Sequence, residues 1–442
     1  MSSGEYNEIH IACAKCGVEK VSDLIEDGAN PNALGKFGST PLHVSAMEGC
    51  ARTTSLLLSN GANPNVFNAF RNTPMQVAAR EGHVRVLDEL IDSGAYLTGT
   101  GALFYAAEAG NIECVERILE IETRAVVFDG PSGQKEDRTP INWEYQLAPE
   151  LNVQPNGTEP DLNPLHAAVR FENKVRIGET PGSILPWSKE SVENLVDLVF
   201  SFVGTTDPRK YQRSPLATAA SIGAPVATER LLEHGFPPNY SNSDQPLNRA
   251  CRSETGTHTK EPRSTASCEV AKTLVEYGAN LQRVNDDVPA SCTRGGETPL
   301  TEAVKGDSEI KGDSIKCVQY LAHRISEKGD LPFKYNDQGL KPIHVAALYD
   351  SPRSVKPLMD AGSNIEAQVK NPDRNQSWFS GTTPVHLAAF ENNAGVIEAL
   401  IQAGVDPNCV DPSDGDTPLH LAVAHFSSKA ESVLLDAGAD PE

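Results

Sequence analysis

The chain has 442 residues, with 60 acidic and 38 basic side chains and a formal net charge of −22. A field of that sign repels nucleic acid and anionic membrane surfaces, so a basic protein or peptide segment is the more natural partner. Residues 1–5 lack the basic and apolar regions of a signal peptide, and no apolar run approaches the roughly 18 residues of a membrane span, so we expect a soluble protein, cytoplasmic or nuclear.

A short segment of the type Thr-Pro-Leu-His, followed by small and apolar residues, recurs along the chain. The threonine predicts a helix N-cap, and the proline suits the first helical position. A second apolar helix follows each copy and ends at a glycine such as Gly61. A helix pair of this kind cannot bury its apolar faces alone, which explains why it recurs. Copies of varying fidelity begin at Ile9, Thr40, Thr73, Leu103, Asn163, Ser214, Gln245, Thr298, Lys341, Thr383 and Thr417.

This unit resembles the ankyrin repeat, whose signature is T-P-L-H-x-A and whose period is about 33 residues. The first three copies keep that period, since Ile9, Leu42 and Met75 follow one another at equal spacing. The resemblance implies an all-α solenoid of about eleven stacked helix-turn-helix repeats, with short β-hairpin fingers between them. It also implies that the histidine of the signature bridges backbone groups of its own and adjoining turns.

The spacing divides the chain into three predicted parts. Residues 1–121 hold the regular repeats 1–4, and residues 122–340 hold degenerate repeats with long insertions. Residues 341–442 hold repeats 9–11, and no polar cap follows the last of them, so a truncated end is left open. The aromatic residues of the insertions have two interpretations: packing against the scaffold, which we favour, and direct ligand contact.

Nothing in the sequence indicates catalysis, a cofactor or a metal. Motifs of zinc proteases, nucleophile elbows, phosphate loops and calcium loops are absent. Nine cysteines without framework spacing argue for a reducing compartment. Cys13 and Cys16 are the only close pair, and both fall in the first predicted helix, so we expect no metal or redox role for them.

Two further expectations concern packing: Leu58 faces the core, and Arg71, which replaces a finger glycine, changes the geometry of its hairpin.

We therefore predict a non-catalytic scaffold for protein–protein interaction. The resemblance implies that partners bind the concave surface made by fingers and first helices. An alternative is an enzyme or small-molecule binder with a pocket formed by the 122–162 and 174–187 insertions, and a second is the targeting part of a longer polypeptide. The expected partner-binding residues are Phe37, Phe67, Phe70 and Asp414 on fingers; Arg80, Arg170, Phe171, Tyr349, Phe390 and His425 before the inter-helix turns; and Trp143, Trp187 and Trp378 in insertions.

Overall fold

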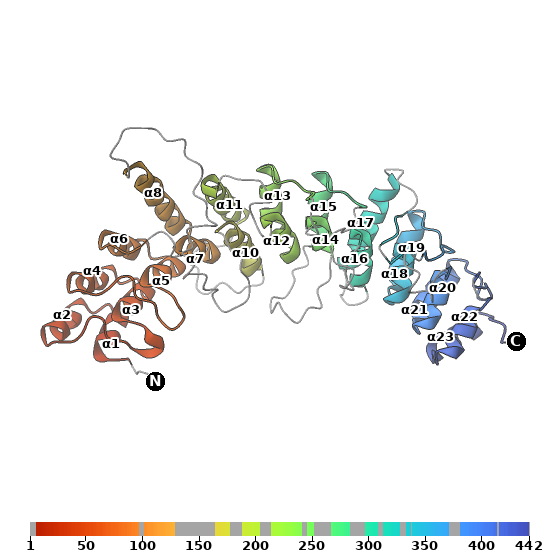
Figure 1. The fold of residues 1–442 in the computed structure, drawn as a ribbon, viewed down its shortest axis with the longest axis horizontal. Coiled ribbons are helices and arrows are strands. Elements are labelled where there is room, and N and C mark those ends of the chain that lie inside the picture. The colour runs from red at the N-terminus through yellow and green to blue at the C-terminus, as the bar shows by residue number, and fades with distance from the viewer. Residues whose placement is uncertain are drawn as a thin grey trace. The chain divides into compact units, whose positions relative to one another are not determined.

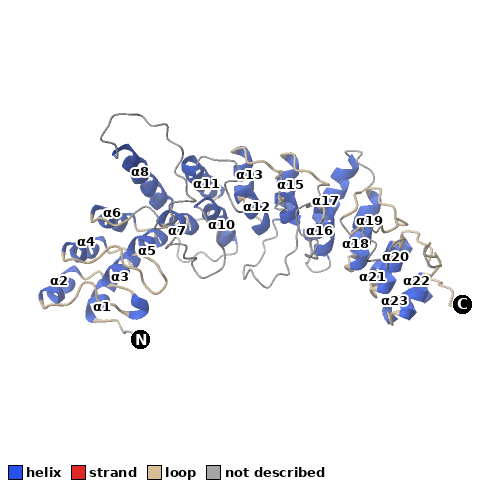
Figure 2. Ribbon diagram, viewed as in Figure 1, coloured by secondary structure: helices blue, strands red, loops and turns tan. Residues whose placement is uncertain are grey.

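The computed structural model contains helices and no β-strand among the residues that it describes (Figures 1 and 2). These residues are 6–96, 101–128, 164–176, 188–203, 214–240, 245–251, 267–282, 297–307, 313–327, 333–336, 338–370, 381–412 and 415–441. The described helices form eleven consecutive pairs, which confirms the number of repeats predicted from the sequence.

The chain divides into two compact units, and the first comprises Met1–Pro215. In this unit the first helices of successive repeats pack in one row and the second helices in another. Its pairs are α1 (Glu8–Ala14) with α2 (Val18–Glu26), α3 (Pro41–Met47) with α4 (Ala51–Ser59), α5 (Pro74–Glu81) with α6 (Val84–Asp92), α7 (Ala102–Ala109) with α8 (Ile112–Phe128), and α10 (Pro164–Arg176) with α11 (Lys189–Val203).

The second unit comprises Leu216–Glu442 and has the same architecture. Each unit is an all-α repeat solenoid. The pairs of the second unit are α12 (Pro215–Ile222) with α13 (Pro225–Glu233), α14 (Pro246–Cys251) with α15 (Ser267–Glu276), α16 (Pro299–Asp307) with α17 (Asp313–Glu327), α18 (Pro342–Leu348) with α19 (Pro352–Asp360), α20 (Pro384–Phe390) with α21 (Ala394–Gln402), and α22 (Pro418–Ala424) with α23 (Ser428–Asp436).

The threonine of the signature caps its helix as predicted. Thr40 accepts a hydrogen bond from the His43 backbone N–H, and its own backbone N–H donates to His43 Nδ1 at 3.1 Å. Thr417 and His420 repeat this arrangement in the last helix pair. Two backbone N–H groups that have no partner within the helix, those of the cap threonine and of the histidine, are thereby each hydrogen-bonded to the other residue's side chain.

The signature histidines join each repeat to the next. His43 Nε2 donates to the Asn72 carbonyl at 2.9 Å, and His344 Nε2 donates to the Ala367 carbonyl at 2.7 Å. His10 and His386 make the same contact with Ser39 and Asp416. The predicted structural role of these histidines is thus confirmed.

Asparagines in the turn that follows the second helix form a parallel set of links. The Asn32 side chain donates to the Gly61 carbonyl at 2.8 Å and accepts from the Asn63 N–H at 2.7 Å. Asn65, Asn239 and Asn408 bind the following repeat in the same way.

A third set of links runs through the turns between paired helices. In the described turns one residue has a positive φ, and where the next residue is His, Asn or Ser its side chain reaches back to a carbonyl of the preceding repeat. His83 donates to the Met47 carbonyl at 3.0 Å, and Asn393 donates to the Ala347 carbonyl at 2.7 Å. These three ladders hold the fingers and helix ends of neighbouring repeats in register.

The helix phase of α4 differs from our expectation by one residue. Leu57 is fully buried, whereas Leu58 is partly exposed. The equivalent pairs Leu90 and Ile91, and Leu400 and Ile401, show the same phase. The prediction that Leu58 faces the core is wrong, because a run of three leucines does not reveal which of them points inward.

The finger that contains Arg71 keeps the geometry of the glycine fingers. Arg71 has φ 58°, close to the φ of 67° at Gly38, which is the equivalent residue of the preceding finger. Hydrogen bonds from the Phe70 and Asn72 N–H groups to the Asn68 side chain close this turn. The expected change in the hairpin is therefore absent, and Arg71 instead adopts a left-handed conformation that disfavours a side chain.

Candidate partner-binding surface

Two neighbouring fingers in the first unit present exposed aromatic rings. Phe37 and Phe70 occupy equivalent positions, are 52% and 57% exposed, and have ring centroids 5.2 Å apart. The Ala69 N–H donates to the Phe37 carbonyl at 2.7 Å, which fixes one finger against the other. The rings therefore meet because the backbone of the fingers is paired, and they remain open to solvent.

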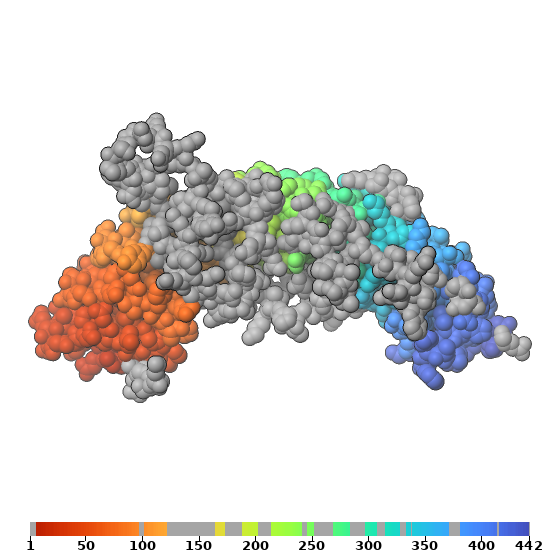
Figure 3. Space-filling model, viewed as in Figure 1, coloured from red at the N-terminus to blue at the C-terminus, as the bar shows by residue number. Residues whose placement is uncertain are grey.

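Leu34 and Phe67 occupy a second pair of equivalent positions on the same two fingers, and both are exposed. We call Leu34, Phe37, Phe67 and Phe70 the finger patch. The space-filling view shows the repeats of residues 6–96, in red to orange, as one continuous packed surface (Figure 3). Exposed aromatic rings in contact, such as Phe37 and Phe70, are typical of interaction sites.

The charge of these two fingers is opposite to that of the chain. Lys36 is the only charged residue of residues 30–40, and Arg71 is the only one of residues 63–73. The Lys36 ammonium lies 5.0 Å from the centre of the Phe37 ring, a cation–π distance. The finger patch is thus apolar and weakly basic in a protein with net charge −22.

The helix ends of the first unit show one error in the predicted surface. Arg80 is exposed and paired with Glu81 at 3.0 Å, and Arg170 is half-exposed. Phe171, however, is only 8% exposed, and its ring lies over Gly110 so closely that a Cβ there would be 2.1 Å from it. The prediction that Phe171 faces outward is wrong, because the absent side chain of Gly110 lets the ring pack inside.

In the second unit the predicted residues lie at the ends of the first helices of three successive repeats, those that begin with α18, α20 and α22. The Phe390 and His425 rings are 4.1 Å apart, with Phe390 half-buried and His425 exposed. Tyr349 is exposed, and the Lys305 ammonium lies 5.2 Å from its ring centre. Phe426 next to His425 is 92% exposed, and our sequence reasoning missed it. The sequence did offer a clue, because Phe426 occupies the inter-helix turn position that is glycine in other repeats, such as Gly49 and Gly82.

The remaining predicted site residues lie outside the described residues. These are Trp143, Trp187, Trp378 and Asp414, together with most of the 122–162 and 174–187 insertions. The pocket of our alternative function falls on these segments, so it stays a prediction.

Comparison with known proteins agrees with the repeat geometry. A family model for ankyrin repeats in three copies matches residues 9–100 and 343–442. The chain is an ankyrin-repeat protein. Ankyrin repeats are generally protein–protein interaction modules and are typically non-catalytic.

Similar proteins share parts of this chain only. The inactive serine/threonine-protein kinase TEX14 of Mus musculus is 37% identical over 83 residues, 19% of this chain and 5% of that protein. Alpha-latrocrustotoxin-Lt1a of Latrodectus tredecimguttatus is 27% identical over 216 residues, 48% of this chain and 13% of that protein. Ankyrin repeat and SOCS box protein 3 of Homo sapiens is 32% identical over 88 residues, which are 20% of this chain and 16% of that protein. The matches therefore span a small fraction of each relative.

A solved structure also matches the ankyrin chain. The crystal structure of the human ASB11 ankyrin repeat domain is 18% identical, with a TM-score of 0.35, and the match covers 72% of this chain and 98% of that one.

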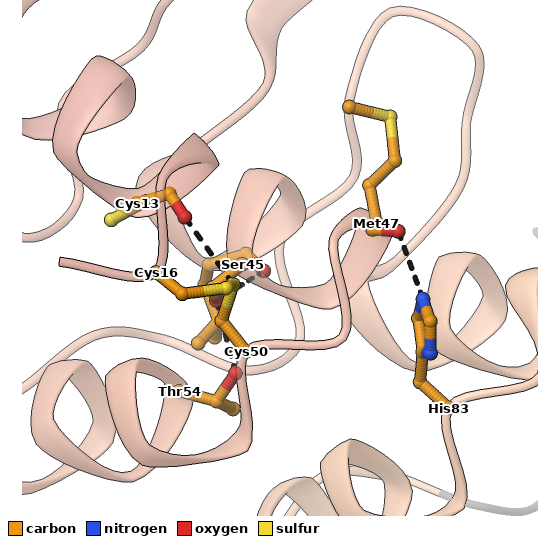
Figure 4. The surroundings of a disulfide bond; sticks show 8 residues. Cys13, Cys16, Ser45, Met47, Cys50, Thr54 and His83 are labelled. Atoms are coloured by element: carbon orange, nitrogen blue, oxygen red, sulfur yellow. Dashed lines mark hydrogen bonds between the residues drawn. A yellow bond between two sulfur atoms is a disulfide. The ribbon is translucent and has the colours of Figure 1, made fainter. Parts of the chain in front are cut away.

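The first two ankyrin repeats carry a feature that the sequence did not predict. Cys16 lies beyond the end of α1 at Ala14 and forms a disulfide with Cys50, with their Cα atoms 5.3 Å apart (Figure 4). Both lie in turns between paired helices, Cys16 between α1 and α2 and Cys50 between α3 and α4. Placing Cys16 within the helix was wrong. The other described cysteines, among them Cys13, are thiols.

Burial shifts the pKa of several cysteine and histidine side chains in the described repeats. Burial raises the pKa of the Cys13 and Cys114 thiols to about 12, which makes them poor nucleophiles. Burial lowers the pKa of His43, and it lowers the pKa of His344 to about 4. Across the described residues no group of three or more His, Cys, Asp or Glu side chains could hold a metal ion, and no described helix has the length and apolarity needed to span a bilayer.

Proposed function

We propose that this ankyrin-repeat protein recognises a partner protein or peptide through the finger patch and the concave helix ends beside it. The observation that carries the proposal is the paired exposure of Phe37 and Phe70, two aromatic rings fixed on adjoining fingers. Aromatic side chains are strongly represented among the residues that dominate binding energy. The paired backbone of the fingers holds the rings in place before binding, which lowers the entropy cost of ordering them.

Net charge and local contact act at different steps of such binding. A charge of −22 steers a basic partner toward the protein over a Debye length of about 8–10 Å. The finger patch then makes the apolar contact, and the Phe390–His425 pair offers a second aromatic contact in the other unit.

The proposal is tested by comparing the proteins that the wild type and a double variant retain from an extract of the native host. Phe37→Ala/Phe70→Ala should weaken binding of a retained partner about 5- to 150-fold, the effect of losing roughly 1–3 kcal/mol at a hot spot. Tyr277→Ala is the matched control, because this exposed aromatic residue lies at the end of a second helix and not on a finger. Equal retention by all three proteins would refute a role for the finger patch.

A further inference from the structure

A tyrosine in the second unit lies close to two lysines that have no carboxylate partner among the described residues. The Lys341 and Lys370 ammonium groups are 5.0 and 4.8 Å from the centre of the Tyr335 ring. Within the described part of the second unit, neither ammonium has an ion pair or a hydrogen bond to an acceptor. Lys341 is nevertheless only 9% exposed. Two positive charges are thus held near one ring without a counter-charge from any residue that the structure describes.

The backbone holds these residues in place. The Lys370 N–H donates to the Gly339 carbonyl at 2.9 Å, which joins one finger to the next. Gly339 has no side chain to obstruct this approach, since a Cβ there would lie 1.2 Å from the Lys370 carbonyl oxygen. The Asn336 side chain accepts the Leu340 N–H at 2.9 Å and closes the finger that carries Lys341. The two lysines are therefore fixed at their Cα atoms before anything binds.

The same unit shows how a half-buried lysine is normally balanced. Lys305 forms an ion pair with Glu297, a carboxylate that is only 2% exposed. Asn336 donates to the second oxygen of this carboxylate at 3.2 Å. Burial lowers the pKa of Lys305, but the Glu297 charge more than offsets this, so the net shift is upward.

Lys341 has the opposite environment. Burial lowers its pKa, and the Lys370 charge lowers it further. Lys341 also stands where other repeats have the capping threonine, and its side chain makes no hydrogen bond to the start of α18. A lysine in place of the threonine thus removes the side-chain cap of this helix and adds a poorly balanced positive charge. A bound anion would relieve the charge repulsion.

We propose that Lys341, Lys370 and Tyr335 form a binding site for a dianionic oxyanion of the phosphate class. Two ammonium groups match a phosphate, which carries about −1.5 to −2 charges at pH 7, better than a single carboxylate. Lysine binds such a group as a point charge, so two ammonium groups that neighbouring fingers hold near one ring suit it. The site does not depend on the proposed partner function, because free phosphate alone should occupy it.

The test is a titration of the full chain with inorganic phosphate at constant ionic strength, followed by calorimetry and by the NMR signals of the lysine side chains. The wild type should show saturable binding. Lys370→Met and Lys341→Thr should each weaken it at least tenfold. Lys341→Thr is expected to fold, because threonine occupies this position in other repeats, such as Thr40. Lys356→Met is the matched control, because Lys356 is exposed and already paired with Asp360 at 3.3 Å.

Two results would overturn the site. One is the absence of saturable phosphate binding by the wild type, which would mean that the charges are balanced within the chain. The other is equal binding by the wild type, Lys341→Thr and Lys370→Met. A phosphoserine peptide then distinguishes the source of the anion. Tighter binding than inorganic phosphate, lost in both lysine variants, indicates a group carried by a peptide, whereas no gain indicates free phosphate; both results support the oxyanion site.

Discussion

Truncation of Leu57 tests the helix phase on which the whole description of the repeats rests. Leu57 is fully buried in α4, which packs between α2 and α6. Leu57→Ala removes that burial and leaves a cavity, so it should cost about 3 kcal/mol, within the range of 2–5 kcal/mol for buried leucines. Leu58 is partly exposed and has water on one side. Leu58→Ala should therefore cost only about 1 kcal/mol.

The measurement is urea unfolding of the full chain, followed by far-UV circular dichroism and by hydrogen exchange of peptides from α4. Hydrogen exchange is needed because a long array of repeats need not unfold in one step. Both variants replace leucine with alanine at neighbouring positions of one helix, so the difference in helix propensity between the two residue types is the same in both. If Leu58→Ala destabilises α4 as much as Leu57→Ala or more, the phase of the helix described above is wrong.

Three further perturbations test the turns and ladders. Arg71→Gly should raise stability by about 1 kcal/mol in urea unfolding, because φ is 58° there; an unchanged or lower midpoint would contradict this. The pKa of His344 is lowered to about 4 from 6.5, so the unfolded chain binds more protons between these values and stability should fall as pH falls through that window, by at most about 3 kcal/mol. His344→Gln, which copies Gln76 in another repeat, should flatten the pH profile, and an unchanged slope would exclude His344 as its cause. Reduction of Cys16–Cys50, which are 34 residues apart, should lower the stability of the first repeats by about 3–4 kcal/mol in the chain-entropy model; equal unfolding midpoints with and without reductant would argue against the bond.

The sequence predicted the repeats well because their signals are local. Thr40, Pro41 and His43 act within one helical turn, and a glycine such as Gly61 ends the following helix, so the number and order of helix pairs could be predicted. The fingers are closed by a few turn hydrogen bonds, such as Asn68 N–H to the Asn72 carbonyl, and contain no strand among the described residues. Their turn residues were visible in the sequence, but their pairing with the next finger was not.

The errors and omissions concern contacts between residues far apart in the chain. Phe171 packs on Gly110, and Cys16 meets Cys50 across two repeats. Neither pair has a local pattern, since each depends on how successive turns stack. The cluster of Lys341, Lys370 and Tyr335 was missed for the same reason, although a lysine in the place of the capping threonine was a visible departure. The burial of Leu57 instead of Leu58 could not be settled within an unbroken run of leucines.

The three ladders share one feature with an evolutionary consequence. In these ladders the crossing side chain ends on a backbone group of the neighbouring repeat: His43 on the Asn72 carbonyl, Asn32 on the Gly61 carbonyl, Ser427 on the Phe390 carbonyl. Backbone groups are the same whatever residue carries them. A repeat can therefore change its side chains without a compensating mutation next door, as Asn248 shows by reaching the Glu297 carbonyl where other repeats use histidine. Such a chain can diversify one repeat at a time, which fits a protein whose signature has eroded unevenly along its length while the stacking has persisted.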